Sequence, residues 1–157
     1  MPRKSHLYSS RVTWVGNTGA GTQSYAGYAR DYCVEIAAKP VLAGSADPAF
    51  RGDANLHNPE DLFLSAIAAC HMLTYLALCA GRGVVVSAYE DHAEGLLSVE
   101  SDGGGRFERI LLRPGVTITR AENADLAMQL HQAAHALCFI GNSCSTPIQH
   151  EARVRIA

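Results

Sequence analysis

The chain carries little charge and no excess of either sign. Only 18% of its 157 residues are charged, and 13 Lys and Arg stand against 15 Asp and Glu, a formal net charge of −2. Proteins that follow the phosphates of nucleic acid carry a basic face, so this balance excludes a nucleic-acid partner. A weakly charged surface also favours association, and we expect an oligomer.

Several familiar motifs are missing. There is no internal repeat, no low-complexity stretch, no Gly-x-Ser-x-Gly and no His-Glu-x-x-His, which removes the common hydrolases. The glycine-rich segment 16–22 (GNTGAGT) lacks the Gly-Lys-Ser/Thr ending of a phosphate loop, and no helical pattern follows it. We predict a plain turn there.

The cysteine count is odd, which argues against a scaffold of disulfides. Five cysteines are present, and the chain opens MPRKSHLYSS without an apolar signal segment, so we expect a cytoplasmic location. Thiols in a reducing compartment are packing residues, metal ligands or redox groups. The length and the 48% of hydrophobic residues predict a single domain over residues 1–157 with a core of its own.

The pattern of apolar residues predicts an α+β domain. A helix is expected over residues 59–80, because Asn58 is a good N-cap, Pro59 suits the first helical position and Gly81 stops the chain. A second helix follows from the apolar spacing in residues 126–137. Strands are predicted at 12–15, 24–36, 84–100, 106–119 and 152–156, with a hairpin at 101–105. The antiparallel strands should pack on the two helices.

The first of these helices includes twenty uncharged residues, 62–81 (LFLSAIAACHMLTYLALCAG), long enough for a membrane span. The segment is only weakly hydrophobic for a membrane span, because it contains Ser65, His71, Thr74 and Tyr75. We therefore predict a helix buried on all sides and no membrane partner.

Helical geometry separates two of the thiols. Cys79 follows Cys70 by nine positions, so it lies about 180° around the helix and about 13 Å further along. Ile67 and Leu73 share the face of Cys70, whereas His71 projects about 100° away and is a poor base for it. On residue type alone, a cysteine in the middle of such a helix is a packing residue. We interpret Cys79 in this way, and Cys33 of the N-terminal segment likewise.

The second helix offers a different chemistry. His131, His135 and Cys138 fall at i, i+4 and i+7, a spacing at which imidazole and thiolate ligands can hold zinc. A fourth ligand would come from Cys70, Cys144 or a water. One alternative is therefore a zinc-binding protein. The other is that this histidine-bearing helix face is only exposed to solvent.

Four phrases, in the right order, together span nearly the whole chain: GTQSYAGYARDY (21–32), NPEDLFLSAIAACH (58–71), AYEDHAEG (88–95) and HALCFIGNS (135–143). They resemble the OsmC/Ohr family of thiol-dependent peroxidases, in its OsmC-like branch. The first cysteine motif of the family, at the opening of its central helix, begins with Asn-Pro-Glu-x-Leu and ends with Ala-Ala-Cys. The phrase around Cys138 resembles the family's second cysteine motif.

The resemblance implies a set of roles. Cys70 would be the peroxidatic thiolate, Cys138 the resolving thiol and Glu60 the family's acid, which is associated with an arginine from the N-terminal strands. Arg30 is our choice for that arginine, with Arg11 as the alternative. The family folds as an intertwined α+β homodimer, so we expect an OsmC-like fold and a homodimer.

The implied activity is the reduction of organic hydroperoxides in oxidative-stress defence. Cys70 would become a sulfenic acid, a Cys70–Cys138 disulfide would follow, and an external dithiol, lipoyl or other, would recycle it without a bound cofactor. The apolar wall of Ile67 and Leu73 favours an alkyl or fatty-acid hydroperoxide. A non-catalytic ligand-binding member of the same fold is the remaining alternative.

Two departures from the pattern concern the second motif. The hydroperoxide-resistance branch usually has proline after the second cysteine, where Phe139 stands here, and Cys144 is an added thiol. Helical geometry adds a constraint on Glu60, which would lie about 15 Å from Cys70 and about 80° off its face. Either the helix breaks between them or Glu60 acts across a dimer interface.

Overall fold

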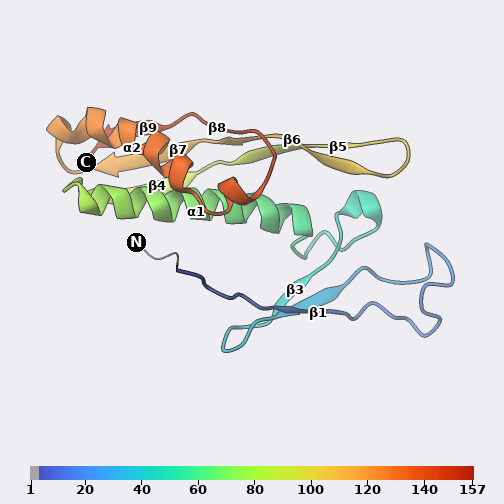
Figure 1. Ribbon diagram of the computed structural model, residues 1–157. Helices are drawn as coiled ribbons and strands as arrows, with labels where there is room; N and C mark the ends of the chain where they lie inside the picture. Colours follow the sequence, from blue (N-terminus) through green and yellow to red (C-terminus); the bar gives the residue numbers. More distant parts are fainter. Residues whose placement is uncertain (1–3) are drawn as a thin grey trace. The chain divides into compact units, whose positions relative to one another are not determined.

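The computed structural model describes residues 4–157, which form two compact units (Figure 1). One unit comprises the residues up to Leu62 and the other comprises Phe63–Ala157. The expectation of a single domain over residues 1–157 stays a prediction.

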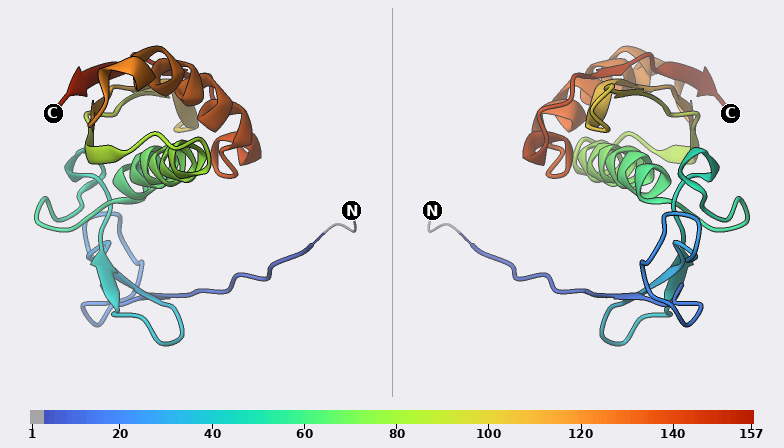
Figure 2. Two further views of the ribbon diagram at one scale, coloured as in Figure 1. Left: turned by 90° about the vertical axis from the view of Figure 1, so that its left-hand side faces the viewer. Right: turned by 90° about the vertical axis from the view of Figure 1, so that its right-hand side faces the viewer.

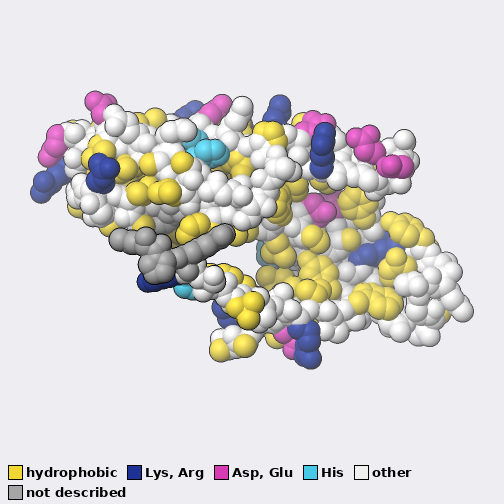
Figure 3. Space-filling view, in the orientation of Figure 1, with side chains coloured by type: hydrophobic (Ala, Val, Ile, Leu, Met, Phe, Trp, Pro, Cys, Tyr) yellow, Lys and Arg dark blue, Asp and Glu magenta, His cyan; other side chains and the backbone are white. Residues whose placement is uncertain are grey.

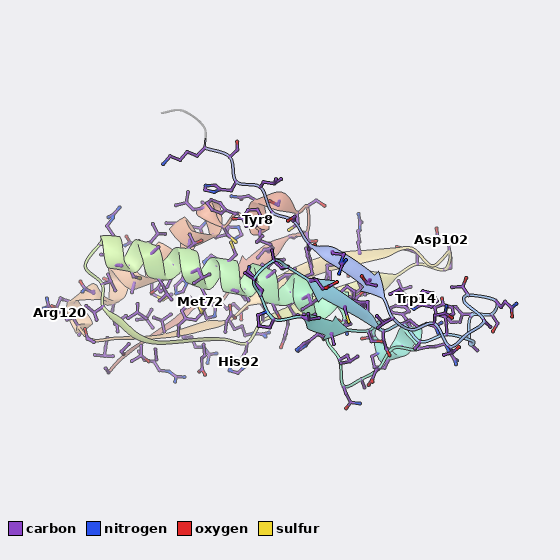
Figure 4. The ribbon with its side chains drawn as sticks, turned by 90° about the horizontal axis from the view of Figure 1, so that it is seen from below. Tyr8, Trp14, Met72, His92, Asp102 and Arg120 are labelled. Carbon is purple, nitrogen blue, oxygen red and sulfur yellow. The ribbon has the colours of Figure 1, made fainter. Side chains whose placement is uncertain are left out.

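The N-terminal unit is built on a three-stranded antiparallel sheet with the strand order β1-β2-β3. Figure 4 shows Trp14 at the end of β1 and Tyr8 in the segment before it. The predicted strand over 24–36 is realised only as β2, because the residues before it form turns. The elements of this unit are β1 (Arg11–Trp14), β2 (Tyr32–Glu35), β3 (Leu42–Gly44) and the 3-10 helix η1 (Pro48–Phe50).

The glycine-rich segment of this unit is a turn, as predicted. The side-chain oxygen of Asn17 accepts hydrogen bonds from the amides of Gly19 (2.9 Å) and Gly21 (3.0 Å). Both glycines have positive φ, 115° and 58°, a region that other residues rarely enter. The side chain of Asn17 therefore stabilises the turn from within the segment.

The second unit carries both long helices. It contains most of α1 (Pro59–Gly81), the strands β4 (Val86–Asp91), β5 (Glu94–Val99), β6 (Gly105–Leu112) and β7 (Pro114–Ile118), the 3-10 helix η2 (Ala121–Asn123), α2 (Ala124–Leu137), the 3-10 helix η3 (Gly141–Ser143), and the strands β8 (Ile148–His150) and β9 (Arg153–Ile156).

The strands of this unit form two three-stranded sheets, ordered β4-β7-β9 and β5-β6-β8. The predicted hairpin joins β5 to β6, with Asp102 at its tip (Figure 4). The sheets are mixed, which corrects the expectation of antiparallel strands alone: β6 pairs with β8 and β7 pairs with β9 in parallel. The chain enters β9 only after crossing over through α2, and such a crossover delivers a parallel strand.

The helix α1 begins as the sequence predicts. The side chain of Asn58 accepts a hydrogen bond from the amide of Asp61 (2.7 Å), and the carboxylate of Asp61 accepts one from the amide of Asn58 (3.4 Å). This reciprocal pair satisfies backbone donors that the first turn leaves free. The helix then runs unbroken to Gly81.

The helix α1 is buried along one stripe and not on all sides. Its buried residues, Ile67, His71, Tyr75 and Cys79, recur every fourth position. The opposite face includes Leu73, which is 63% exposed. By length and composition α1 is long and apolar enough to cross a membrane. The expectation of full burial is wrong because the strands and α2 cover only the stripe.

The core of the second unit lies between these layers, with the strands curving over α1 and α2 beside them (Figure 2). One cluster joins Tyr75 and Cys79 of α1 to Val116 and Ile118 of β7 and to Leu130 of α2. A second cluster joins Ile67 of α1 to β6. Burial of these side chains fixes α2 against α1, and with it the two cysteines of interest.

Candidate active site

The structure brings Cys70 and Cys138 together. Cys70 lies in the middle of α1, and Cys138 is the C-cap of α2. The amide of Ile140 donates to Cys70 Sγ (3.5 Å), and the next amide, of Gly141, donates to Cys138 Sγ (3.4 Å). The two thiols are near enough that Cys70 raises the pKa of Cys138. Two consecutive backbone donors therefore face two adjacent sulfur atoms.

The two sulfur atoms differ in environment. Cys70 is half-buried, whereas Cys138 is only 3% exposed. Burial raises the pKa of Cys138; its neighbour Cys70 raises it further, and the amide of Gly141 lowers it. Cys138 therefore keeps its proton at neutral pH, and Cys70 is the sulfur that solvent reaches.

The remaining cysteines occupy separate places. Cys144 is half-buried and donates from its sulfur to the carbonyl oxygen of Gly141 (3.4 Å). Cys79 is buried in the core cluster, where burial raises its pKa, and Cys33 lies in β2. All five cysteines are free thiols.

A buried histidine pair ties the two helices together. His71 Nε2 and His131 Nδ1 lie 3.2 Å apart in a hydrogen bond, with the two residues 1% and 0% exposed. Tyr75 stacks on the His131 ring at 3.9 Å between centroids. Since His71 follows Cys70 and points into the core, it is no base for that thiol, as its place on the helix predicted.

Two further histidines lie beside this pair. The ring of His150 lies 5.6 Å from that of His71 and 5.7 Å from that of His135. Burial, together with the neighbouring histidines, lowers the pKa of His71 to about 4 and that of His131 to about 3. All of these effects favour neutral rings.

The zinc alternative is not supported by the geometry. Over residues 4–157 no group of three or more His, Cys, Asp or Glu side chains is arranged to hold a metal ion. His131 uses Nδ1 toward His71, and Cys138 faces Cys70 and the loop amide. His131, His135 and Cys138 share a helix face, but they do not converge.

Glu60 lies in the first turn of α1. Because the helix is unbroken, the alternative of a helix break between Glu60 and Cys70 is wrong, and the rise of the helix keeps them about 15 Å apart. Glu60 and Asp61 help to raise the pKa of Tyr32, after burial. Within the described chain the Glu60 Oε2 atom is buried and has no hydrogen-bond partner.

Neither candidate arginine pairs with Glu60 among the residues from 4 to 62. Arg11 forms an ion pair with Glu35 across the β1–β2 ladder (2.7 Å). Arg30 places its guanidinium 4.4 Å from the ring centre of Tyr25 and 4.1 Å from that of Tyr28, and donates to both of their carbonyl oxygens. The expected arginine–glutamate pair is therefore absent from this single chain.

Residues 52–153 match the family model of the OsmC-like proteins. This chain belongs to the OsmC-like family. The match covers the first cysteine motif and the second, with the sheets between them.

Known OsmC-like proteins agree with this chain in fold. A structure of an OsmC-like protein of unknown function from Vibrio cholerae has a TM-score of 0.84 and 29% identity over 95% of this chain and all of that one. An organic hydroperoxide resistance protein from Elizabethkingia anophelis has a TM-score of 0.68 at 18% identity, covering 98% of this chain and 100% of that one, which shows the fold alone. The uncharacterized protein YmaD of Bacillus subtilis is 27% identical over 104 residues, 63% of this chain and 69% of that protein.

Two parts of the site were not predicted from the sequence, and one residue was predicted in the wrong place. The backbone donors of Ile140 and Gly141 carry no side-chain signal, because any residue except proline supplies an N–H. The hydrogen bond between His71 and His131 joins two helices that are far apart along the chain. Ile67, expected in the wall beside Cys70, is instead 1% exposed and belongs to the core.

Proposed function

We propose that this OsmC-like protein is a thiol peroxidase that reduces organic hydroperoxides to alcohols, in defence against oxidative stress. The observation that carries the proposal is the adjacency of Cys70 and Cys138, with consecutive amides donating to both sulfur atoms. Two adjacent free thiols can convert a sulfenic acid into a disulfide.

Exposure and charge assign the two roles. Cys70 is the more accessible sulfur atom and accepts a hydrogen bond from the amide of Ile140, so we assign it the attack on the peroxide. Cys138 is buried, and its raised pKa keeps it protonated, so it escapes the peroxide and waits for the sulfenic acid. The order of events follows from this asymmetry.

The cycle balances without a bound cofactor. The Cys70 thiolate attacks one oxygen of R–O–OH, the O–O bond breaks, and the alkoxide takes a proton to leave as alcohol. The resulting sulfenic acid condenses with the Cys138 thiol, forming the disulfide and releasing water. An external dithiol, a lipoyl group or another, then reduces the disulfide and is itself oxidised.

The surface near Cys70 suits an apolar substrate. Leu73 is one turn from Cys70 and 63% exposed, and Phe139, beside the Ile140 amide, is 82% exposed. Leu73 thus keeps the role that was expected of it, and Phe139 takes the place of the buried Ile67. Their apolar area favours an alkyl or fatty-acid hydroperoxide over hydrogen peroxide.

A second copy of the chain would complete the site. The exposed face of α1 is apolar, and hydrophobic side chains reach the surface in several places (Figure 3). We propose a homodimer that covers part of this face and leaves Leu73 open to substrate, in which the partner subunit's Glu60 pairs with an arginine, Arg30 or Arg11, near Cys70. A well-placed cationic donor on the developing oxyanion is worth about 100-fold or more in rate.

The central experiment maps oxidation after one equivalent of cumene hydroperoxide. We expect a loss of two hydrogens, mapped by peptide mass spectrometry to Cys70 and Cys138, and repeated turnover when a dithiol is added. In Cys138→Ser, a sulfenic acid should accumulate at Cys70 and react with dimedone. Cys33→Ser, which alters a thiol of the N-terminal unit, is the matched control and should behave as wild type.

Other outcomes favour the alternatives. Stable oxidation at Cys33 or Cys79 with Cys70 and Cys138 untouched would reject the peroxidase. Disulfide formation without turnover on any hydroperoxide and dithiol would favour a non-catalytic ligand-binding member of the family.

Shared sites are tested with mixed dimers. A heterodimer of Cys70→Ser and Glu60→Ala chains keeps one intact composite site if Glu60 acts across the interface, so it should show about half of the wild-type activity. Activity no higher than that of either homodimer would refute the shared site.

We also propose a cytoplasmic location, and the five free thiols agree with it.

A further inference from the structure

A third thiol lies on the same loop as the resolving cysteine. The segment 138–144 (CFIGNSC) begins with Cys138 and ends with Cys144, and both sulfur atoms contact Gly141. The amide of Gly141 donates to Cys138 Sγ at 3.4 Å, while Cys144 Sγ donates to the carbonyl oxygen of Gly141 at 3.4 Å. The preceding amide, of Ile140, donates to Cys70 Sγ. Three sulfur atoms therefore meet one short stretch of backbone.

We infer that Cys144 is a second resolving thiol, which receives the disulfide from Cys70 and leaves Cys70 free again. This inference rests on the proposed peroxidase function. After the Cys70–Cys138 disulfide has formed, Cys144 loses its proton to solvent and attacks Cys138 Sγ. The Cys138–Cys144 bond forms, the Cys70–Cys138 bond breaks, and its electron pair leaves as the Cys70 thiolate. The step neither consumes nor produces an oxidant.

The loop is built to permit this exchange. Its backbone hydrogen bonds are local, from Asn142 to the carbonyl of Cys138 and from Ser143 to that of Ile140, so they can rearrange without disturbing the sheets. The segment 138–144 has no proline to restrict its backbone. Cys144 is half-buried and packs on the core cluster that joins Ile67 to β6.

The exchange solves a problem of access. In the first disulfide Cys138 is buried, and Cys70 is the sulfur that the next peroxide needs. Moving the bond to Cys138 and Cys144 frees Cys70 before any external dithiol has arrived. A chain that lacks reductant can then react with a second hydroperoxide, which leaves a sulfenic acid on Cys70.

The test counts peroxide equivalents and maps bonds by time. Full-length reduced protein receives one equivalent of cumene hydroperoxide, is quenched in acid at intervals and is mapped after alkylation. We expect the Cys70–Cys138 bond first and the Cys138–Cys144 bond later, with Cys70 again alkylatable. A second equivalent should then be consumed and make Cys70 reactive to dimedone, so the peroxide consumed doubles to about two equivalents per chain.

Two variants sharpen the outcome. Cys144→Ser should stop at one equivalent with a persistent Cys70–Cys138 bond, whereas Cys33→Ser should match wild type. If wild-type Cys144 stays alkylatable while the Cys70–Cys138 bond persists, the exchange is refuted and the peroxidase stands. If Cys70 is never oxidised in any of these proteins, the proposed function fails and the exchange fails with it.

Discussion

The amide of Ile140 is the single backbone donor that reaches Cys70 Sγ in the described chain, and it can be removed by one substitution. Proline has no N–H, and its ring requires a φ near −65°. Ile140 already has φ −69°. Ile140→Pro therefore deletes the donor and keeps this backbone angle, and a slower reaction of Cys70 with peroxide is the expected result.

The size of the effect follows from the geometry. Hydrogen bonds to charged groups contribute about 1.5–3 kcal/mol. The N···S distance of 3.5 Å is long, which places this bond at or below the lower end, at about 1–1.5 kcal/mol. Since about 1.4 kcal/mol is tenfold in rate, the thiolate should react roughly tenfold more slowly.

The neighbouring position provides a matched control. Phe139→Pro also places a ring in this loop, but among residues 4–157 the Phe139 amide makes no hydrogen bond. Cys138 before it has ψ 111°, close to the range that a residue preceding proline prefers. With hydrogen peroxide as the oxidant, which does not use the apolar side chain of Phe139, Phe139→Pro should keep the wild-type rate.

The assay is the second-order rate of Cys70 oxidation by hydrogen peroxide in a single turnover, followed by loss of alkylatable thiol. Thermal unfolding of both variants checks that the fold is intact. Equal slowing in the two proline variants would show that loop stiffness matters and the amide does not. A wild-type rate in a folded Ile140→Pro protein would refute the role of the donor.

Acid should weaken the fold through His71 and His131, whose folded pKa values of about 4 and about 3 lie below the ordinary 6.5. From pH 6.5 down to about 4 the unfolded chain binds protons that the folded one does not, so the free energy of unfolding falls by about 1.4 kcal/mol per pH unit for each histidine. Urea unfolding at several pH values measures this fall in the free energy of unfolding. The control His57→Gln, at an exposed position, should keep the same dependence on pH. Imidazole NMR signals of His71 and His131 that titrate near pH 6.5 would contradict the prediction. Asn58→Ala should cost about 1 kcal/mol of stability in urea, and Asn58→Asp should restore most of it, because the cap needs only an acceptor. Leu73→Ala should raise KM for cumene hydroperoxide by about tenfold and leave hydrogen peroxide unaffected; an equal change for both peroxides, or in the control Leu96→Ala, would refute the apolar contact.

The local elements could be read from the sequence because their causes are local. Asn58, Pro59 and Asp61 determine where α1 begins, and the glycines after Val99 place the hairpin of β5 and β6. Asn17 and its glycines likewise make a turn from neighbouring atoms alone. Capping and turn formation involve residues within a few positions of one another, so no tertiary contact is needed to predict them.

Long-range pairing was less accessible. The strands β8 and β9 join their sheets in parallel, which depends on where the chain returns after α2. The short β3 and β8 carry too few residues for a pattern, and their pairing partners form them. The burial of α1 along one stripe was also missed, because its composition is apolar on every side and only the packed neighbours select a face.

The sequence by itself determined the two helices, the hairpin and the two cysteine motifs that resemble the OsmC/Ohr family. Only the tertiary structure decided that Cys70 meets Cys138, that the amides of Ile140 and Gly141 face their sulfur atoms, and that Cys144 shares the loop. The reason is physical: a thiol's neighbours depend on how α2 packs on α1, and that packing is set by buried side chains such as Tyr75 and Leu130 from distant parts of the chain.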